Sequence, residues 1–199
     1  MRYFTLCLLL ILVNGCSERP KLERLPADAV ILAFGDSLTF GTGASEGESY
    51  PAQLEKLVGR RVVRAGVPGE VTAQALSRLP AALDEHSPRL LVLCIGGNDF
   101  LRRLGNGQAE RNVREMVKLA RSRGIGVLLL GTPEPGFTVT PPKFYATIAK
   151  EYGLAYEESV IGQVLKDSTL KADPIHPNAR GYRLIAERVA ETLKQNGAI

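Results

Sequence analysis

Only one of the two histidines in the sequence lies in a setting suited to acid–base chemistry. His176 stands between two prolines in KADPIHPN, three residues after Asp173. A stiff turn can bring side chains at this spacing together, and a carboxylate on Nδ1 fixes the imidazole tautomer and stabilises its protonated form. The alternative is a rigid turn whose polar residues begin the last helix. His86, in DEHSPR, is expected at an exposed helix end.

Ser37 is a group that such a base could deprotonate. It follows an apolar run in ILAFGDSL, at the point where a predicted strand ends. A serine at the start of a helix has a free backbone N–H near the positive end of the helix dipole. That N–H could hold an oxyanion while Oγ attacks a carbonyl. The alternative is that Asp36 or Ser37 simply caps a helix.

Two further loops could complete an oxyanion hole. Gly69 in VPGE would let a backbone N–H approach a ligand closely, and Asn98 in GGND offers a side-chain amide donor. Each stretch alone is an ordinary turn signature. Together the four stretches predict an acyl-transfer site. The sequence has no C-x-x-C, no H-E-x-x-H and no Cys/His cluster, so we expect neither a metal site nor a cofactor.

The elements that must position these residues alternate along the chain. Apolar runs with strand-like bounds cover residues 30–34, 61–67, 90–95, 127–130 and 154–156. Segments with helical spacing cover residues 50–58, 73–83, 109–123, 143–152 and 178–194. This alternation predicts one doubly wound α/β domain with a parallel sheet. Ligands bind beyond the carboxyl ends of such strands, where the candidate residues follow their runs.

The first residues have the features of a targeting segment. Residues 3–13 are apolar after a single arginine, and this run is too short to span a bilayer, so it is typical of a secretory signal. The stretch VNGC resembles the bacterial lipobox, in which the signal is cut before a cysteine that carries lipid. We expect a lipoprotein signal peptide over residues 1–15 and lipidation of Cys16. A charged, proline-bearing tether over 16–27 and a folded domain over 28–199 would follow. The alternative is an ordinary signal with a chance cysteine.

Composition limits the remaining classes. The net charge of +4 is mild and spread along the chain, without a basic stripe or an aromatic platform, so we expect no nucleic-acid partner. Cleavage before Cys16 would leave Cys94 as the other cysteine, inside an apolar run, so no disulfide framework is expected. A lipid anchor would place the protein in a bacterial cell envelope, facing the periplasm or the exterior. We expect a monomer.

The candidate stretches resemble the four blocks of the SGNH (GDSL) hydrolases: GDSL with Ser37, VPGE with Gly69, GGND with Asn98, and DPIH with Asp173 and His176. The chain is most similar to the small bacterial thioesterase, lysophospholipase and arylesterase group. The resemblance implies a flavodoxin-like three-layer α/β/α sandwich of about five strands in the order 2-1-3-4-5. It also implies Ser37 as nucleophile, His176 as base, Asp173 as its orienter, and an oxyanion hole from the Ser37 N–H, the Gly69 N–H and the Asn98 side chain.

The second block departs from the family pattern. It often reads N-A-x-x-G-D, whereas this chain has RAGVPGE, which leaves Gly66 as a competing candidate although the register favours Gly69. The expected function is a serine esterase that hydrolyses short acyl esters, aryl esters or lysophospholipids through an acyl-enzyme. A carbohydrate O-acetylesterase and an inactive lipid-anchored binding protein are the alternatives. Residues 132–142 are expected to form a loop over the site, where Phe137 and Val139 could line an acyl pocket.

Overall fold

The computed structural model describes residues 21–136 and 138–199. Five parallel strands form one sheet in the order β2-β1-β3-β4-β5. The strands are β1 (Ile31–Gly35), β2 (Val62–Gly66), β3 (Leu90–Cys94), β4 (Gly126–Leu130) and β5 (Ala155–Glu157). The predicted α/β class and the strand order implied by the family resemblance are both confirmed.

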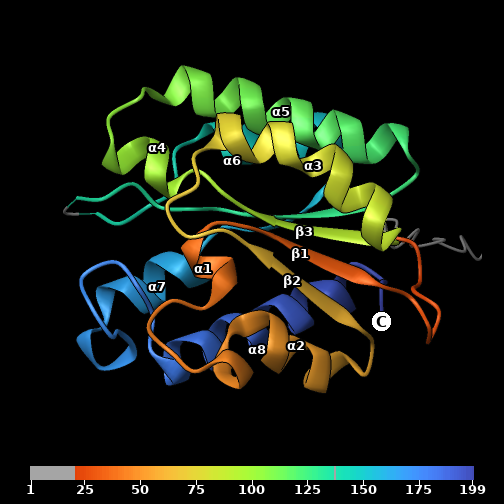
Figure 1. Ribbon diagram of the computed structural model, residues 1–199, viewed down its shortest axis with the longest axis horizontal. Helices are drawn as coiled ribbons and strands as arrows, with labels where there is room; N and C mark the ends of the chain where they lie inside the picture. Colours follow the sequence, from red (N-terminus) through yellow and green to blue (C-terminus); the bar gives the residue numbers. More distant parts are fainter. Residues whose placement is uncertain (1–20, 137) are drawn as a thin grey trace, which may run out of the picture.

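Helices cover both faces of the sheet (Figure 1). One layer holds α3 (Thr72–His86), α4 (Gly97–Leu101), α5 (Asn106–Ser122) and α6 (Phe144–Tyr152). The opposite layer holds α1 (Ser37–Phe40), α2 (Tyr50–Val58), α7 (Val160–Lys166) and α8 (Ala179–Gln195). Two short 3₁₀ turns lie at Glu46–Glu48 and Ser168–Leu170. The chain therefore folds into three layers.

Alternation along the strands builds two cores, because successive side chains of a strand point to opposite faces. In β1, Ile31 and Ala33 pack with residues of α2 and α8, whereas Leu32 and Phe34 pack with residues of α3 and α5. All five residues of β1 and of β3 are buried. The central strands are buried on both faces, as their continuous apolar runs predict.

The predicted elements occur near their expected positions, and the helix expected at Ser37 is present as α1, but two short helices could not be predicted. α4 and α7 have five and seven residues. One or two turns show too little periodicity to be recognised in a sequence. The stretch GGND has the composition of a turn, but Gly97 begins α4. α3 is also longer than the helix predicted over residues 73–83, and it runs from Thr72 to His86.

The folded domain begins earlier than the expected boundary at residue 28. Leu22 and Leu25 are buried in the core. Their backbone N–H groups donate to the carbonyls of Asn196 at 3.1 Å and Ala198 at 2.8 Å, at the end of the chain. Part of the expected tether over 16–27 therefore packs on the domain, because its two leucines turn inward among charged neighbours. The expected signal peptide and Cys16 lie outside the described residues.

Candidate active site

Ser37 is held at the carboxyl end of β1 by a tight strand-to-helix connection. Asp36 caps α1, and its Oδ1 accepts a hydrogen bond from the Leu38 N–H at 3.0 Å. A Cβ at Gly35 would lie 1.8 Å from the carbonyl oxygen of Cys94, so only glycine fits there. Ser37 is the first residue of the helix, where a backbone N–H has no intrahelical acceptor.

His176 reaches Ser37 from a turn that lies 139 residues further along the chain. Its Nε2 is 3.0 Å from Ser37 Oγ, and its Nδ1 is 2.7 Å from Oδ2 of Asp173. The other carboxylate oxygen of Asp173 accepts the backbone N–H groups of Ile175 at 2.9 Å and His176 at 2.8 Å. Serine, imidazole and carboxylate are thus in line, and the turn fixes the ring before any substrate binds.

The surroundings of Asp173 keep its carboxyl group ionised. Partial burial raises its pKa, but hydrogen bonds from the His176 ring and from the Ile175 and His176 N–H groups outweigh this and leave the pKa below the usual range. Helix capping, the alternative interpretation of this turn, is the role of a neighbouring residue. Asn178 caps α8 by accepting the Gly181 N–H at 3.1 Å.

Asn98 and Gly69 lie on adjacent loops at the same edge. Asn98, in α4, lines the cavity beside Ser37, and one amide N–H donates to the carbonyl of Glu70 at 3.0 Å, which leaves its second N–H available. Gly69 has φ +79°, a conformation that favours glycine, and its carbonyl accepts Arg102 Nη2 at 2.7 Å. Gly69 is not among the residues that line the cavity.

Gly66, the competing candidate, has a packing role. It is the last residue of β2, and a Cβ there would lie 2.1 Å from the backbone nitrogen of Phe40 in α1. Close packing of α1 against β2 therefore requires a glycine at this position. The turn that follows β2 is also fixed to β1, because the Val67 N–H donates to the Gly35 carbonyl at 3.0 Å.

A cavity of about 350 Å³ opens beside Ser37, Asn98 and His176. Most of its other lining residues are apolar and come from α1, α4, α7 and the loops after β4 and before His176. These apolar residues are Leu38, Leu101, Pro133, Pro135, Val139, Leu165, Pro174 and Ile175. Val139 lines the cavity as expected, and Phe137 lies outside the described residues. Glu134 and Lys171 add two charged groups to the lining.

Several of these lining residues could not be predicted from the sequence. Leu101 and Leu165 lie on α4 and α7, short helices without a readable period, so no signal pointed to them. Ile175 precedes His176 in a stretch already singled out. As an exposed apolar side chain, it was recognisable only once the turn was placed at the cavity.

Other reactive side chains are placed apart from this site. Cys94 is a free, buried thiol in β3, and burial raises its pKa far above the usual range. His86 ends α3 and is half-buried, against the expectation of an exposed residue. Ser45 lies in a G-x-S-x-G stretch, but it is exposed and donates to Glu48 at 2.5 Å. No group of three or more metal-binding side chains occurs in residues 21–136 and 138–199.

A parallel α/β/α sandwich with a serine, a histidine and an aspartate in line at its carboxyl edge is an arrangement typical of serine hydrolases. The chain belongs to the GDSL-like lipase/acylhydrolase family, whose family model matches residues 33–184.

Individual relatives agree with this family. The chain is 32% identical to esterase TesA of Pseudomonas aeruginosa over 92% of this chain and 97% of that protein. It is 31% identical to thioesterase 1/protease 1/lysophospholipase L1 of Escherichia coli, over 86% of each chain. A crystal structure of TesA matches with a TM-score of 0.70 and 30% identity, covering 84% of this chain and 99% of that one. The chain is a serine esterase of the GDSL type.

Proposed function

We propose that Ser37 hydrolyses carboxylic esters through an acyl-enzyme. The observation that carries this proposal is the 3.0 Å approach of His176 Nε2 to Ser37 Oγ, with Asp173 at 2.7 Å on the other ring nitrogen. His176 takes the Oγ proton as Oγ bonds to the ester carbonyl, and then gives that proton to the departing alcohol. Water, deprotonated by His176, then attacks the acyl-enzyme. The bond from the acyl carbon to Oγ breaks, His176 returns the proton to Ser37 Oγ, and the acid is released.

Three donors stabilise the negative charge on the tetrahedral intermediate in this proposal. They are the N–H of Ser37 at the start of α1, the N–H of Gly69, and the amide N–H of Asn98 that Glu70 leaves free. Asp173 remains ionised and stabilises the imidazolium that forms at each proton transfer. The mechanism uses side chains and backbone N–H groups of this chain, together with water.

The cavity favours small substrates with an apolar acyl or aryl group. A volume of about 350 Å³ is near the lower end of the roughly 300–1,000 Å³ that is typical of ligand sites. Walls such as Leu101, Val139 and Leu165 offer an acyl chain an apolar surface and offer few partners to sugar hydroxyls. We therefore infer that short acyl and aryl esters are preferred, with lysophospholipids as the lipid substrates.

A substrate series tests both the activity and this preference. The probes are p-nitrophenyl acetate, butyrate, octanoate and laurate, together with a lysophosphatidylcholine and an acetylated xylan. We expect rapid turnover of the shorter p-nitrophenyl esters, little release of acetate from the glycan, and loss of turnover in Ser37→Ala. Undiminished turnover by Ser37→Ala would refute the proposal. A folded wild-type protein without turnover of any probe would instead support the binding-protein alternative.

We also propose that Cys16 carries a lipid that anchors the protein in a bacterial cell envelope. The sequence VNGC supports this. Separately, none of the helices in residues 21–136 and 138–199 is long and apolar enough to cross a membrane. Lys21, the first described residue, lies near the amino ends of β3 and β4, whereas Ser37 lies at the carboxyl end of β1. Such an anchor would hold the active site on the side of the domain away from it.

Metabolic labelling with a fatty acid tests the anchor. We expect label in the wild-type chain and in Cys94→Ala, which keeps the candidate lipidation residue, and none in Cys16→Ala. Label that persists in Cys16→Ala contradicts the proposal.

A further inference from the structure

The loop that carries Gly69 contains a buried carboxylate that the proposed mechanism does not use. Glu70 follows Gly69, and its side chain is 6% exposed. Its backbone connects the two loops of the proposed oxyanion hole, because its carbonyl accepts Asn98 Nδ2 at 3.0 Å and its N–H donates to Val67 at 3.1 Å. The position of Glu70 therefore affects both Gly69 and Asn98.

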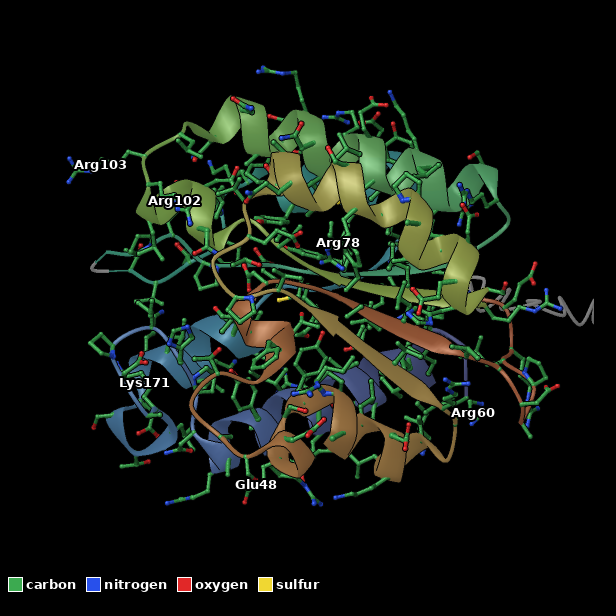
Figure 2. The ribbon with its side chains drawn as sticks, in the orientation of Figure 1. Glu48, Arg60, Arg78, Arg102, Arg103 and Lys171 are labelled. Carbon is green, nitrogen blue, oxygen red and sulfur yellow. The ribbon has the colours of Figure 1, made fainter. Side chains whose placement is uncertain are left out.

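One guanidinium group holds this carboxylate. Arg78, in α3, donates from Nε to one carboxylate oxygen of Glu70 at 2.8 Å and from Nη2 to the other at 2.6 Å. Such a two-point pair fixes direction as well as distance, which an ammonium group cannot do. Figure 2 shows Arg78 between α3 and the sheet, although a basic residue on a surface helix normally points to solvent.

The same guanidinium also binds the two strands that flank the loop. Arg78 Nη2 lies 3.3 Å from the carbonyl of Gly35 and 3.2 Å from that of Ala65, and the group stacks 4.0 Å above the ring of Phe34. Gly35 is the last residue of β1, two residues before Ser37. Arg78 therefore joins the end of the nucleophile strand to the loop of Gly69 and Glu70.

We infer that Arg78, through Glu70, is a positioning residue for the oxyanion hole. This inference rests on the proposed function, because it assumes that Gly69 and Asn98 stabilise the charge that develops when Ser37 attacks. Arg78 lies behind the loop and is not among the residues that line the cavity. Its removal should therefore displace donors rather than remove a substrate contact, and displacement of about 1 Å can reduce a rate about 10²-fold.

The pair also stabilises the loop itself. The Glu70 side chain reaches Arg78 in α3, and both of its carboxylate oxygens accept hydrogen bonds from that guanidinium. Removing one partner of a buried pair leaves an unpaired charge, which is strongly destabilising.

The test compares Arg78→Lys with Arg114→Lys as a matched control. Arg114 also pairs with a glutamate, Glu110 at 2.7 Å, is half-buried at 22% exposure, and lies on α5 away from the cavity. The measurements are kcat and KM for p-nitrophenyl butyrate, urea unfolding, and the affinity of a trifluoromethyl ketone, which mimics the oxyanion. If Arg78→Lys does not fold, the double variant Glu70→Gln/Arg78→Met, which leaves no unpaired charge, takes its place.

We expect Arg78→Lys to lower kcat about 10- to 100-fold with KM nearly unchanged. Affinity for the ketone should fall by the same factor, and Arg114→Lys should keep the wild-type kcat. In an Asn98→Ala background, Arg78→Lys should lower kcat by a much smaller factor, because both changes act on the same donors. A folded Arg78 variant with kcat within twofold of wild type, a change in KM alone, or full additivity with Asn98→Ala would overturn the inference. Undiminished activity in Ser37→Ala would instead overturn the proposed function.

Discussion

Two aspartates beside the same serine have opposite electrostatic environments. Asp173 contacts the His176 ring and two backbone N–H groups, which outweigh its partial burial and lower its pKa. Asp36 is fully buried, and this burial raises its pKa to about 7. The backbone hydrogen bond from Leu38 opposes the rise, and the charges of Glu70 and Asp99 add to it. The carboxylate that can serve His176 at neutral pH is therefore Asp173, and Asp36 is the cap of α1.

Asp36→Asn tests this interpretation through the pH dependence of stability. Between the ordinary aspartate value of 3.8 and about 7, the folded state keeps a proton that the unfolded chain has lost. In this window Asp36 lowers stability as pH rises, by at most about 1.4 kcal/mol per pH unit. Asparagine keeps the cap acceptor without ionising. The stability of Asp36→Asn relative to wild type, measured by urea unfolding, should therefore increase from pH 4 to pH 7. A difference from wild type that does not change with pH contradicts this account.

At the scale of elements, short connections between helices position the site. Asp99, next to Asn98 in α4, is buried and accepts the N–H and hydroxyl of Thr72 at 2.8 and 2.6 Å, at the first residue of α3. A negative charge at a helix N-terminus is stabilised by the free N–H groups there. This contact joins α4, which carries Asn98, to α3, which carries Arg78.

Asp99→Ala should destabilise the fold by about 2–3 kcal/mol, because it removes two hydrogen bonds to a buried charge. Urea unfolding checks this loss. Asp84→Ala is the control at the other end of α3, since the Asp84 side chain is 70% exposed and pairs with Arg123 at the surface. That control should lie within about 0.5 kcal/mol of wild type. Equal effects of the two substitutions would contradict the capping role of Asp99.

The elements also show why part of the site could be predicted and part could not. The expectation that Ser37 and His176 lie together follows from parallel strands that end at one edge and from a turn with two prolines, and these features are visible in the sequence. The inward course of Arg78 is not visible, because α3 is amphipathic and an arginine on such a helix is ordinarily solvated. The hydrogen bonds from Arg78 to Glu70 and to the Gly35 carbonyl form only once α3 is packed on the sheet.

At the scale of the whole molecule, residues 22–25 and the final residues of the chain complete the core on the face opposite α3 and α5. Leu22 and Leu25 are buried with residues of α8 and bond to the final residues of the chain, close to the point labelled C in Figure 1. These leucines were not expected in the core, because each stands alone among charged neighbours and makes no periodic pattern. A domain cut at residue 28 would lose both.

Leu25→Ala should lower the free energy of unfolding by about 2 kcal/mol, the lower end of the usual cost for a buried leucine, because Leu25 lies at the margin of the core. Thermal and urea unfolding measure this loss. Glu23→Ala, at an exposed neighbouring position, is the control and should be nearly neutral. If a chain that begins at residue 28 is as stable as the wild type, the segment is not part of the fold.

In the proposed reaction one serine, activated by His176, carries the acyl group. Labelling with an ethyl fluorophosphonate, followed by peptide mass spectrometry and by turnover of p-nitrophenyl butyrate, tests this role. We expect one adduct per chain at Ser37, loss of turnover in proportion to labelling, and little labelling in His176→Ala. Full turnover by a chain already labelled at Ser37, or inactivation with the adduct on another residue, would contradict it.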